Sequence, residues 1–172
     1  MEYDVTEEEA EKLYFTWLYS IDLNTAQHIL KTVSRHTSVG DQDKSLRYYM
    51  LMALVVTYMR PFSVNYGTVI EKDSLRQNDL VPPEYMGLHD RIKNYRNQQF
   101  AHTDVEYFKP RMGNLGTIDQ PHWTLSFRGS EFEFLDKNLQ RIGELIGIVE
   151  ARVNALLAEK LAYLNSKAAR TP

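Results

Sequence analysis

Residues 136–164 have the sequence DKNLQRIGELIGIVEARVNALLAEKLAYL, a run without proline in which apolar residues return every three or four positions. This period places the apolar side chains on one face of an α-helix. We therefore expect one long amphipathic helix that closes a helical bundle, followed by a polar tail, residues 165–172, that frays. The apolar face consists of Leu139, Ile142, Ile146, Val149, Val153, Leu157, Leu161 and Leu164.

The N-terminal part of the chain predicts a first helix. Thr6 and Glu9 fit a capping box, in which the Thr6 hydroxyl accepts from the Glu9 amide and the Glu9 side chain reaches back. Apolar residues follow at helical spacing from Ala10 to about His36. Because Asn24 is a good N-cap residue, this region is expected to be either one kinked helix or two.

Two more helices are expected between this region and the long helix. One begins near Asp43 and is apolar on nearly all sides, so we place it in the centre of the protein. Pro61 ends it after Arg60, because the proline ring disfavours helical backbone angles at the residue before it. The other begins near Pro83, since proline favours the first helical position. Residues 62–81 have no clear period, and we interpret them as a loop with one helical turn.

A small β-hairpin is expected between the third helix and the long one. Apolar and polar residues alternate around Trp123 and again around Phe132, and Gly129-Ser130 supplies a two-residue turn. We place this hairpin at about residues 122–135 and expect it to pack on the bundle or on a partner chain. The predicted fold class is therefore all-α: a single domain, residues 1–172, forming an up-down bundle of about four main helices with a hairpin insertion.

Composition narrows the classes of function. The chain has no cysteine, which excludes a disulfide scaffold, a thiolate zinc site and a cysteine nucleophile. The formal net charge is −3, so any nucleic-acid binding must come from a local basic patch. The apolar run at residues 50–56 is too short to span a bilayer, and the acidic start lacks the pattern of a signal peptide. We therefore expect a cytoplasmic protein without membrane contact.

The candidate functional segment is residues 95–104, YRNQQFAHTD. Histidine titrates near neutral pH and can transfer a proton, while arginine stays charged and offers a fork of donors that matches phosphate oxygens. On an ideal helix Arg96 and His102 lie about 120° apart and about 9 Å along the axis, with Gln99 between them. A second copy across a two-fold axis would double the site. This set of side chains suits phosphodiester chemistry.

Other catalytic patterns are missing from the sequence. It contains no Gly-rich phosphate loop, no His-Glu-x-x-His and no Gly-x-Ser-x-Gly. The five histidines show no metal-ligand spacing relative to one another. We therefore expect neither a bound metal ion nor a cofactor.

The segment that begins at Arg96 resembles the signature of HEPN domains, in the form Arg-Asn-x-x-x-Ala-His-x-Asp of abortive-infection-type members. A second stretch, Tyr58-Met59-Arg60-Pro61-Phe62, is similar to a stretch of those members. The resemblance implies an all-helical bundle, usually dimeric, in which two motifs face each other across a cleft. In active members this is a metal-independent endoribonuclease. The resemblance also implies a toxin or phage-defence setting, with an antitoxin or a nucleotidyltransferase as a partner.

The resemblance further implies a role for each catalytic residue. His102 would handle the proton of the ribose 2′-hydroxyl or of the leaving oxygen. Arg96 would stabilise the phosphorane, and Asn97 would position either Arg96 or His102. The cleaved RNA would carry a 2′,3′-cyclic phosphate. The supporting residues of the candidate site are Asp104, Gln99 and Arg60.

These residues also have structural interpretations. His102 continues the apolar stripe of the third helix and could be a half-buried histidine satisfied by a neighbouring helix. Asp104 could orient His102, or it could be a turn residue after the helix. Arg96 could pair with Glu144 or Glu150 on the last helix, which would stabilise the bundle by little.

Two other functions stay open for the whole protein. The chain could be a non-catalytic binding module that uses the same residues to hold a nucleotide, an RNA end or a protein partner. It could also be a structural component of a larger assembly, with the hairpin as an apolar docking surface. Arg60 could reach the motif, or it could do no more than stabilise the dipole at the end of its helix.

Overall fold

The computed structural model describes residues 5–36, 41–100, 111–114, 116–117, 120, 122–126 and 132–168. This part of the chain is mostly helical with one small antiparallel sheet, which confirms the predicted all-α bundle with a hairpin. None of the described helices is long and apolar enough to cross a membrane. The elements are α1 (Glu7–Arg35), α2 (Asp41–Met59), the 3₁₀-helix η1 (Arg60–Phe62), α3 (Gln77–Leu80), α4 (Pro83–Tyr95), the π-helix η2 (Arg96–Phe100), β1 (Arg111–Asn114), β2 (Trp123–Ser126), α6 (Glu133–Lys137) and α7 (Leu139–Ala168).

The first helix, α1, is continuous, which decides between the one-helix and two-helix alternatives. The predicted capping box is confirmed, because the Glu9 amide donates to the Thr6 hydroxyl and the Thr6 amide donates to the Glu9 carboxylate. Asn24 caps nothing; its side-chain amide donates to Glu150 of α7 at 3.3 Å. The helix continues through this point because Leu23 is fully buried, and tertiary packing outweighs a local cap preference.

The second helix, α2, packs against both α1 and α4, as its apolar pattern predicts. Leu54 in its middle is buried. Pro61 ends the α-helix at the expected place, and the chain passes into η1 there. Not every apolar side chain of α2 is covered, however, since Leu46 and Tyr49 near its start are exposed. The loop that follows η1 holds the one expected helical turn, α3.

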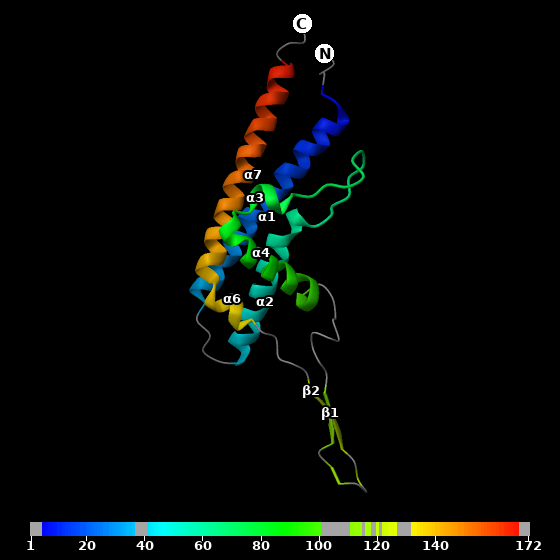
Figure 1. Ribbon diagram of the computed structural model, residues 1–172, viewed down its shortest axis with the longest axis vertical. Coiled ribbons are helices and arrows are strands. Elements are labelled where there is room, and N and C mark those ends of the chain that lie inside the picture. Colours follow the sequence, from blue (N-terminus) through cyan, green and yellow to red (C-terminus); the bar gives the residue numbers. More distant parts are fainter. Residues whose placement is uncertain are drawn as a thin grey trace.

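Figure 1 shows the last helix, α7, running antiparallel to α1 along the length of the molecule. The two helices approach closely at Gly143, where a Cβ atom would lie 2.7 Å from the Leu30 side chain. Toward the upper end of Figure 1 they diverge. The predicted apolar seam is therefore buried from Ile142 to Val153, whereas Leu161 is exposed. The helix continues to Ala168, four residues into the tail that was expected to fray.

The hairpin lies between the third core helix and the last one, but one of its strands differs from the prediction. The predicted strand around Phe132 leads instead into α6. Packing explains the difference, because Phe134 stacks on Tyr95 of α4 and Leu135 is fully buried. Gly129-Ser130 lie outside the described residues. The observed register pairs Arg111 with Ser126, Met112 with Leu125, Gly113 with Thr124 and Asn114 with Trp123.

One arginine fastens three helices at the lower end of the bundle. Arg47 of α2 donates from Nε to the Asp136 carboxylate of α6 at 2.8 Å. Its Nη1 donates to the carbonyls of Val33 and His36 at 2.7 and 2.6 Å. These carbonyls lie at the end of α1, where few backbone donors are left, and the Val33 carbonyl also accepts from the His36 amide at 3.2 Å. Arg47 therefore caps α1 from a neighbouring helix.

Candidate functional site

The candidate motif begins where α4 changes into the π-helix η2. Tyr95, the last α-helical residue, is buried and stacks on Phe134 with 6.0 Å between the ring centroids. Arg96 follows at a half-buried position, and Asn97 is exposed. Single π-turns, which have i→i+5 hydrogen bonds, are rare in proteins as a whole. Those that occur are often found at functional sites. The anchored Tyr95 thus holds the start of the motif at the protein surface.

A hydrogen bond joins the first two polar residues of the motif. Arg96 donates from Nη1 to the Asn97 side-chain oxygen at 3.0 Å. The carboxylates considered as partners for Arg96 bind elsewhere: Glu144 accepts from Tyr85 at 2.8 Å, and Glu150 accepts from Asn24. The Arg96 guanidinium is therefore oriented by a neutral amide from its own helix end.

The other residues of the predicted site are placed less fully. His102 and Asp104 lie outside the described residues, and Gln99 is described only as part of the η2 backbone. The distance from Arg96 to His102 therefore stays a prediction.

Arg60 lies at the start of η1 and points toward α1. Its Nη1 donates to the Asp22 carboxylate at 3.2 Å. Burial raises the pKa of Asp22, and the Arg60 charge and hydrogen bond lower it, with burial the larger effect. Arg60 is thus held by a carboxylate of α1, while Arg96 is held by Asn97.

The structure connects residues 58–62 to the helix that leads into the motif through a contact that sequence reasoning missed. The Tyr58 hydroxyl and His89 Nδ1 lie 2.9 Å apart, and both side chains are fully buried. The Phe62 ring meets the His89 ring edge-on with 4.6 Å between centroids. Tyr58 and Phe62 flank Arg60, and His89 lies two helical turns before Arg96. This Tyr58–His89–Phe62 joint therefore fixes η1 against the helix that leads into the motif.

The electrostatics of His89 suit a structural role. Burial lowers the pKa of His89 to about 4, so the ring is neutral at pH 7. Its Nε2 is buried and has no hydrogen-bond partner among the described residues. The only available signal in the sequence was that the histidine falls on the buried face of α4 with Leu88 and Ile92. Tyr58 is 31 positions away, and spacing alone cannot show such a pair.

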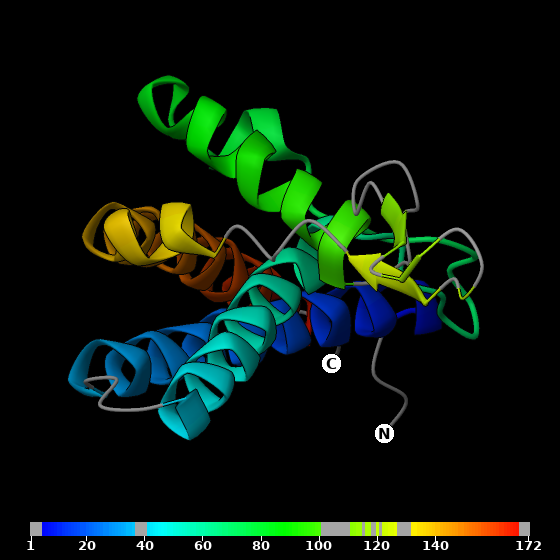
Figure 2. The ribbon, with the colours of Figure 1, turned by 90° about the horizontal axis from the view of Figure 1, so that it is seen from below.

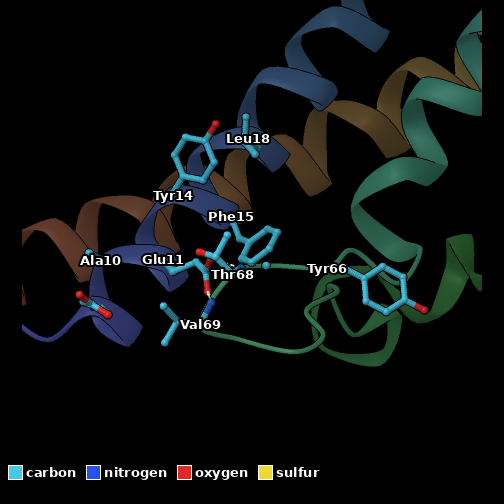
Figure 3. Close-up of a pocket in the computed structure, with 10 residues that line it drawn as sticks. Ala10, Glu11, Tyr14, Phe15, Leu18, Tyr66, Thr68 and Val69 are labelled. Carbon is cyan, nitrogen blue, oxygen red and sulfur yellow. Dashed lines mark hydrogen bonds between the residues drawn. The ribbon is translucent and has the colours of Figure 1, made fainter.

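A cavity lies beside the first turns of α1 (Figure 3). It has a volume of about 740 Å³ and is lined by α1 and by the loop that includes Thr68. The Glu11 carboxylate accepts from the amides of Thr68, Val69 and Ile70, and these bonds lower its pKa to about 2. Because Glu11 already accepts several hydrogen bonds, we interpret it as a clip that holds the loop on α1.

Neither metal-ligating side chains nor known relatives indicate a more specific function. Within the described ranges, no group of three or more metal-ligating side chains is placed to hold an ion. Comparisons with protein families, curated proteins and solved structures found no match for the chain.

Proposed function

We propose that the chain is a metal-independent endoribonuclease of the HEPN type, with Arg96, Asn97 and His102 as its catalytic residues. The observation that carries the proposal is the Arg96–Asn97 hydrogen bond at the surface end of α4. A guanidinium has five N–H donors, so one bond to an amide orients it and the others can bind phosphate oxygens. The resemblance of the motif and the helical bundle support the same assignment.

The proposed reaction needs only the RNA and these side chains. The ribose 2′-oxygen attacks the adjacent phosphorus, the bond from phosphorus to the 5′-oxygen breaks, and the products end in a 2′,3′-cyclic phosphate and a 5′-hydroxyl. His102 accepts the 2′-hydroxyl proton, and the imidazolium of the same or the facing copy donates a proton to the leaving oxygen. Arg96 stabilises the charge that develops on the phosphoryl oxygens, and Asn97 keeps the guanidinium in place.

The proposed setting is the cytoplasm, where the enzyme would act as a toxin or a phage-defence effector. The proposal includes a homodimer with facing motifs, and an antitoxin or a nucleotidyltransferase as a further partner.

A non-catalytic binding module would use the same Arg96 donors, and it differs in one observable. Such a module would bind RNA and release it intact.

The test is incubation of the purified protein with a mixed RNA pool in EDTA. We expect cyclic-phosphate fragments from the wild type and a loss of about 10²–10³-fold in Arg96→Ala, the usual effect of removing a group that stabilises developing charge. Arg96→Lys should also be impaired, because lysine lacks the planar fork. His102→Ala should be inactive. The matched control is Arg76→Ala, which removes an exposed arginine just before α3.

Two results would count against this proposal. Unchanged cleavage in both Arg96→Ala and His102→Ala would place the activity elsewhere in the chain. Intact RNA that is bound by the wild type and released by Arg96→Ala would favour the binding module.

A further inference from the structure

The solvent-facing side of α1 carries a second apolar stripe. Tyr14, Trp17 and Ile21 are 54%, 48% and 41% exposed, although they are spaced as a helix face that packs on something. At 100° per residue they fall within about 60° of one another, on the side opposite the buried Tyr19 and Leu23. A helix at the surface of a bundle ordinarily needs only one such stripe. We call these three residues the outer stripe.

Grooves border this face on both sides. Where α1 and α7 diverge, a groove of about 330 Å³ has an almost wholly apolar lining that includes Leu161, itself 43% exposed. Between α1 and α2, farther along the same face, a second groove of about 370 Å³ lies beside Thr25 and His28. Exposed Tyr49 of α2 forms part of its wall. The half of the outer face nearer the start of α1 thus carries the exposed aromatic side chains Tyr14 and Trp17, which themselves line the first groove, and the other half carries the second groove.

We propose that this face is the interface between two copies of the chain, which pair through α1 in antiparallel orientation about a two-fold axis near Ile21. Tyr14 and His28 are each seven residues from Ile21, and Trp17 and Thr25 are each four residues from it. A two-fold axis there puts Tyr14 against the partner's His28. The aromatic side chains of each copy then enter the α1–α2 groove of the other, as an isologous interface requires.

The charges along α1 favour the same orientation. The first ten residues of α1 contain four glutamates and one lysine, whereas residues 26–35 contain Lys31 and Arg35 and no acid. Glu7 and Arg35 are each fourteen residues from Ile21 and are exposed. Antiparallel pairing therefore places Glu7 near the partner's Arg35. Parallel pairing would place it near the partner's Glu7, which is unfavourable.

The apolar area is of the size that such an interface needs. A stable interface buries about 800 Å² on each partner, roughly 60% of it apolar. Half-exposed aromatic side chains offer on the order of 100 Å² each, so the outer stripe with Leu161 and Tyr49 supplies about 400–500 Å². Figure 2 shows the start of α4 on the opposite side of the bundle from α1. None of the residues that form the outer stripe or line the two grooves belongs to α4 or η2, so this contact is separate from the Arg96 site. A dimer with facing motifs would use a second face of each copy.

The first test is the molar mass in solution, measured by light scattering over a range of protein concentrations. We expect the wild-type assembly to halve in mass when Ile21→Asp is introduced, with a dissociation constant raised at least about a hundredfold. The matched control is Tyr66→Asp, at an apolar side chain that is 73% exposed but lies off this face. It should leave the mass unchanged. Circular dichroism checks that both variants keep their helices.

The second test determines the relative orientation of the two α1 helices. Because the chain has no cysteine, any disulfide must form between the introduced residues. Glu7→Cys and Arg35→Cys proteins are mixed and oxidised, and we expect a disulfide-linked heterodimer that neither protein forms alone. The charge exchange Glu7→Arg with Arg35→Glu should restore the dimer that each single change weakens. A wild type that is monomeric at high micromolar concentration would overturn the proposal. So would Glu7→Cys that cross-links to itself, or a mass that Ile21→Asp does not change.

Discussion

His89 and Arg96 lie on one continuous helical segment and meet opposite environments. His89 is fully buried, and its Nδ1 is paired with the Tyr58 hydroxyl. Arg96, seven residues later, reaches the surface and is oriented by Asn97. The histidine thus fixes where the helix lies, while the arginine can meet a ligand. This division assigns the proton-transfer role of the proposed reaction to a different histidine, His102.

The burial of His89 makes stability depend on pH. Its folded-state pKa of about 4 lies below the ordinary value of 6.5, so the unfolded chain binds more protons between those values. The stabilisation is therefore present at pH 7 and is lost as the pH falls through this window. We expect the free energy of unfolding to drop by about 2 kcal/mol more between pH 7 and pH 4.5 in the wild type than in His89→Gln.

Urea unfolding at the two pH values measures this difference. His122→Gln is the matched control, because the His122 side chain is exposed just before β2 and lies outside the proposed interface. An equal drop in the wild type and in His89→Gln would show that the buried imidazole is not the group that titrates.

At the scale of the element, the contact between α1 and α7 depends on a glycine. Gly143 lets the helices approach until a Cβ atom would lie 2.7 Å from Leu30, and Gln27 donates to the Gly143 carbonyl at 3.2 Å. Gly87 of α4 is also helical, but a Cβ atom there would meet nothing within 4 Å. The first glycine is thus required by packing, and the second is not.

These two glycines give opposite predictions for the same substitution. Gly87→Ala should raise the free energy of unfolding by about 0.5–1 kcal/mol, since alanine favours the helix and nothing obstructs its methyl group. Gly143→Ala gains the same propensity but forces the buried Leu30 side chain to move, so we expect a net loss of about 1 kcal/mol. The free energy of unfolding of both variants is measured by chemical denaturation. A gain in both would mean that α1 and α7 are less closely packed at this point.

The elements that sequence predicted are those whose signals are local. The Thr6 capping box, the proline at position 61 and the regular period of α7 each act within a few residues. The strand partner of Trp123 could not be predicted, because Phe134 is drawn into a contact with Tyr95, far away in the chain. The His89 joint was missed for the same reason. At the candidate site, the motif was visible in the sequence, but the π-helix and the Arg96–Asn97 bond were not.

At the scale of the whole molecule, the two ends of the bundle are fastened by different means. The lower end depends on Arg47, a mostly buried arginine that bonds to α6 and to the last carbonyls of α1. The upper end depends on bonds across the surface: Lys167 Nζ lies 3.0 Å from the Glu9 carboxylate, and Lys160 donates to Thr16 at 2.7 Å. The lower end is thus the part where one side chain affects several helices.

Removing Arg47 should therefore destabilise the entire bundle. Arg47→Met leaves the partly buried Asp136 carboxylate without its cation, and it removes the side-chain donor to the Val33 and His36 carbonyls at the end of α1. We expect a loss of about 2–4 kcal/mol in the free energy of unfolding, measured by urea denaturation. Lys137→Ala, which breaks the exposed pair with Glu133, is the control and should change it by less than about 0.5 kcal/mol. Similar effects of the two changes would contradict the role assigned to Arg47.

The bond between Glu9 and Lys167 has a topological consequence. It brings together two points that are 158 residues apart along the chain. A short peptide that joined the backbone near these points would turn the bundle into a ring without moving any helix. Closing so large a loop removes much of the conformational freedom of the unfolded chain, and the loss of entropy rises with the length enclosed. The molecule is therefore suited to backbone cyclisation and to circular permutation.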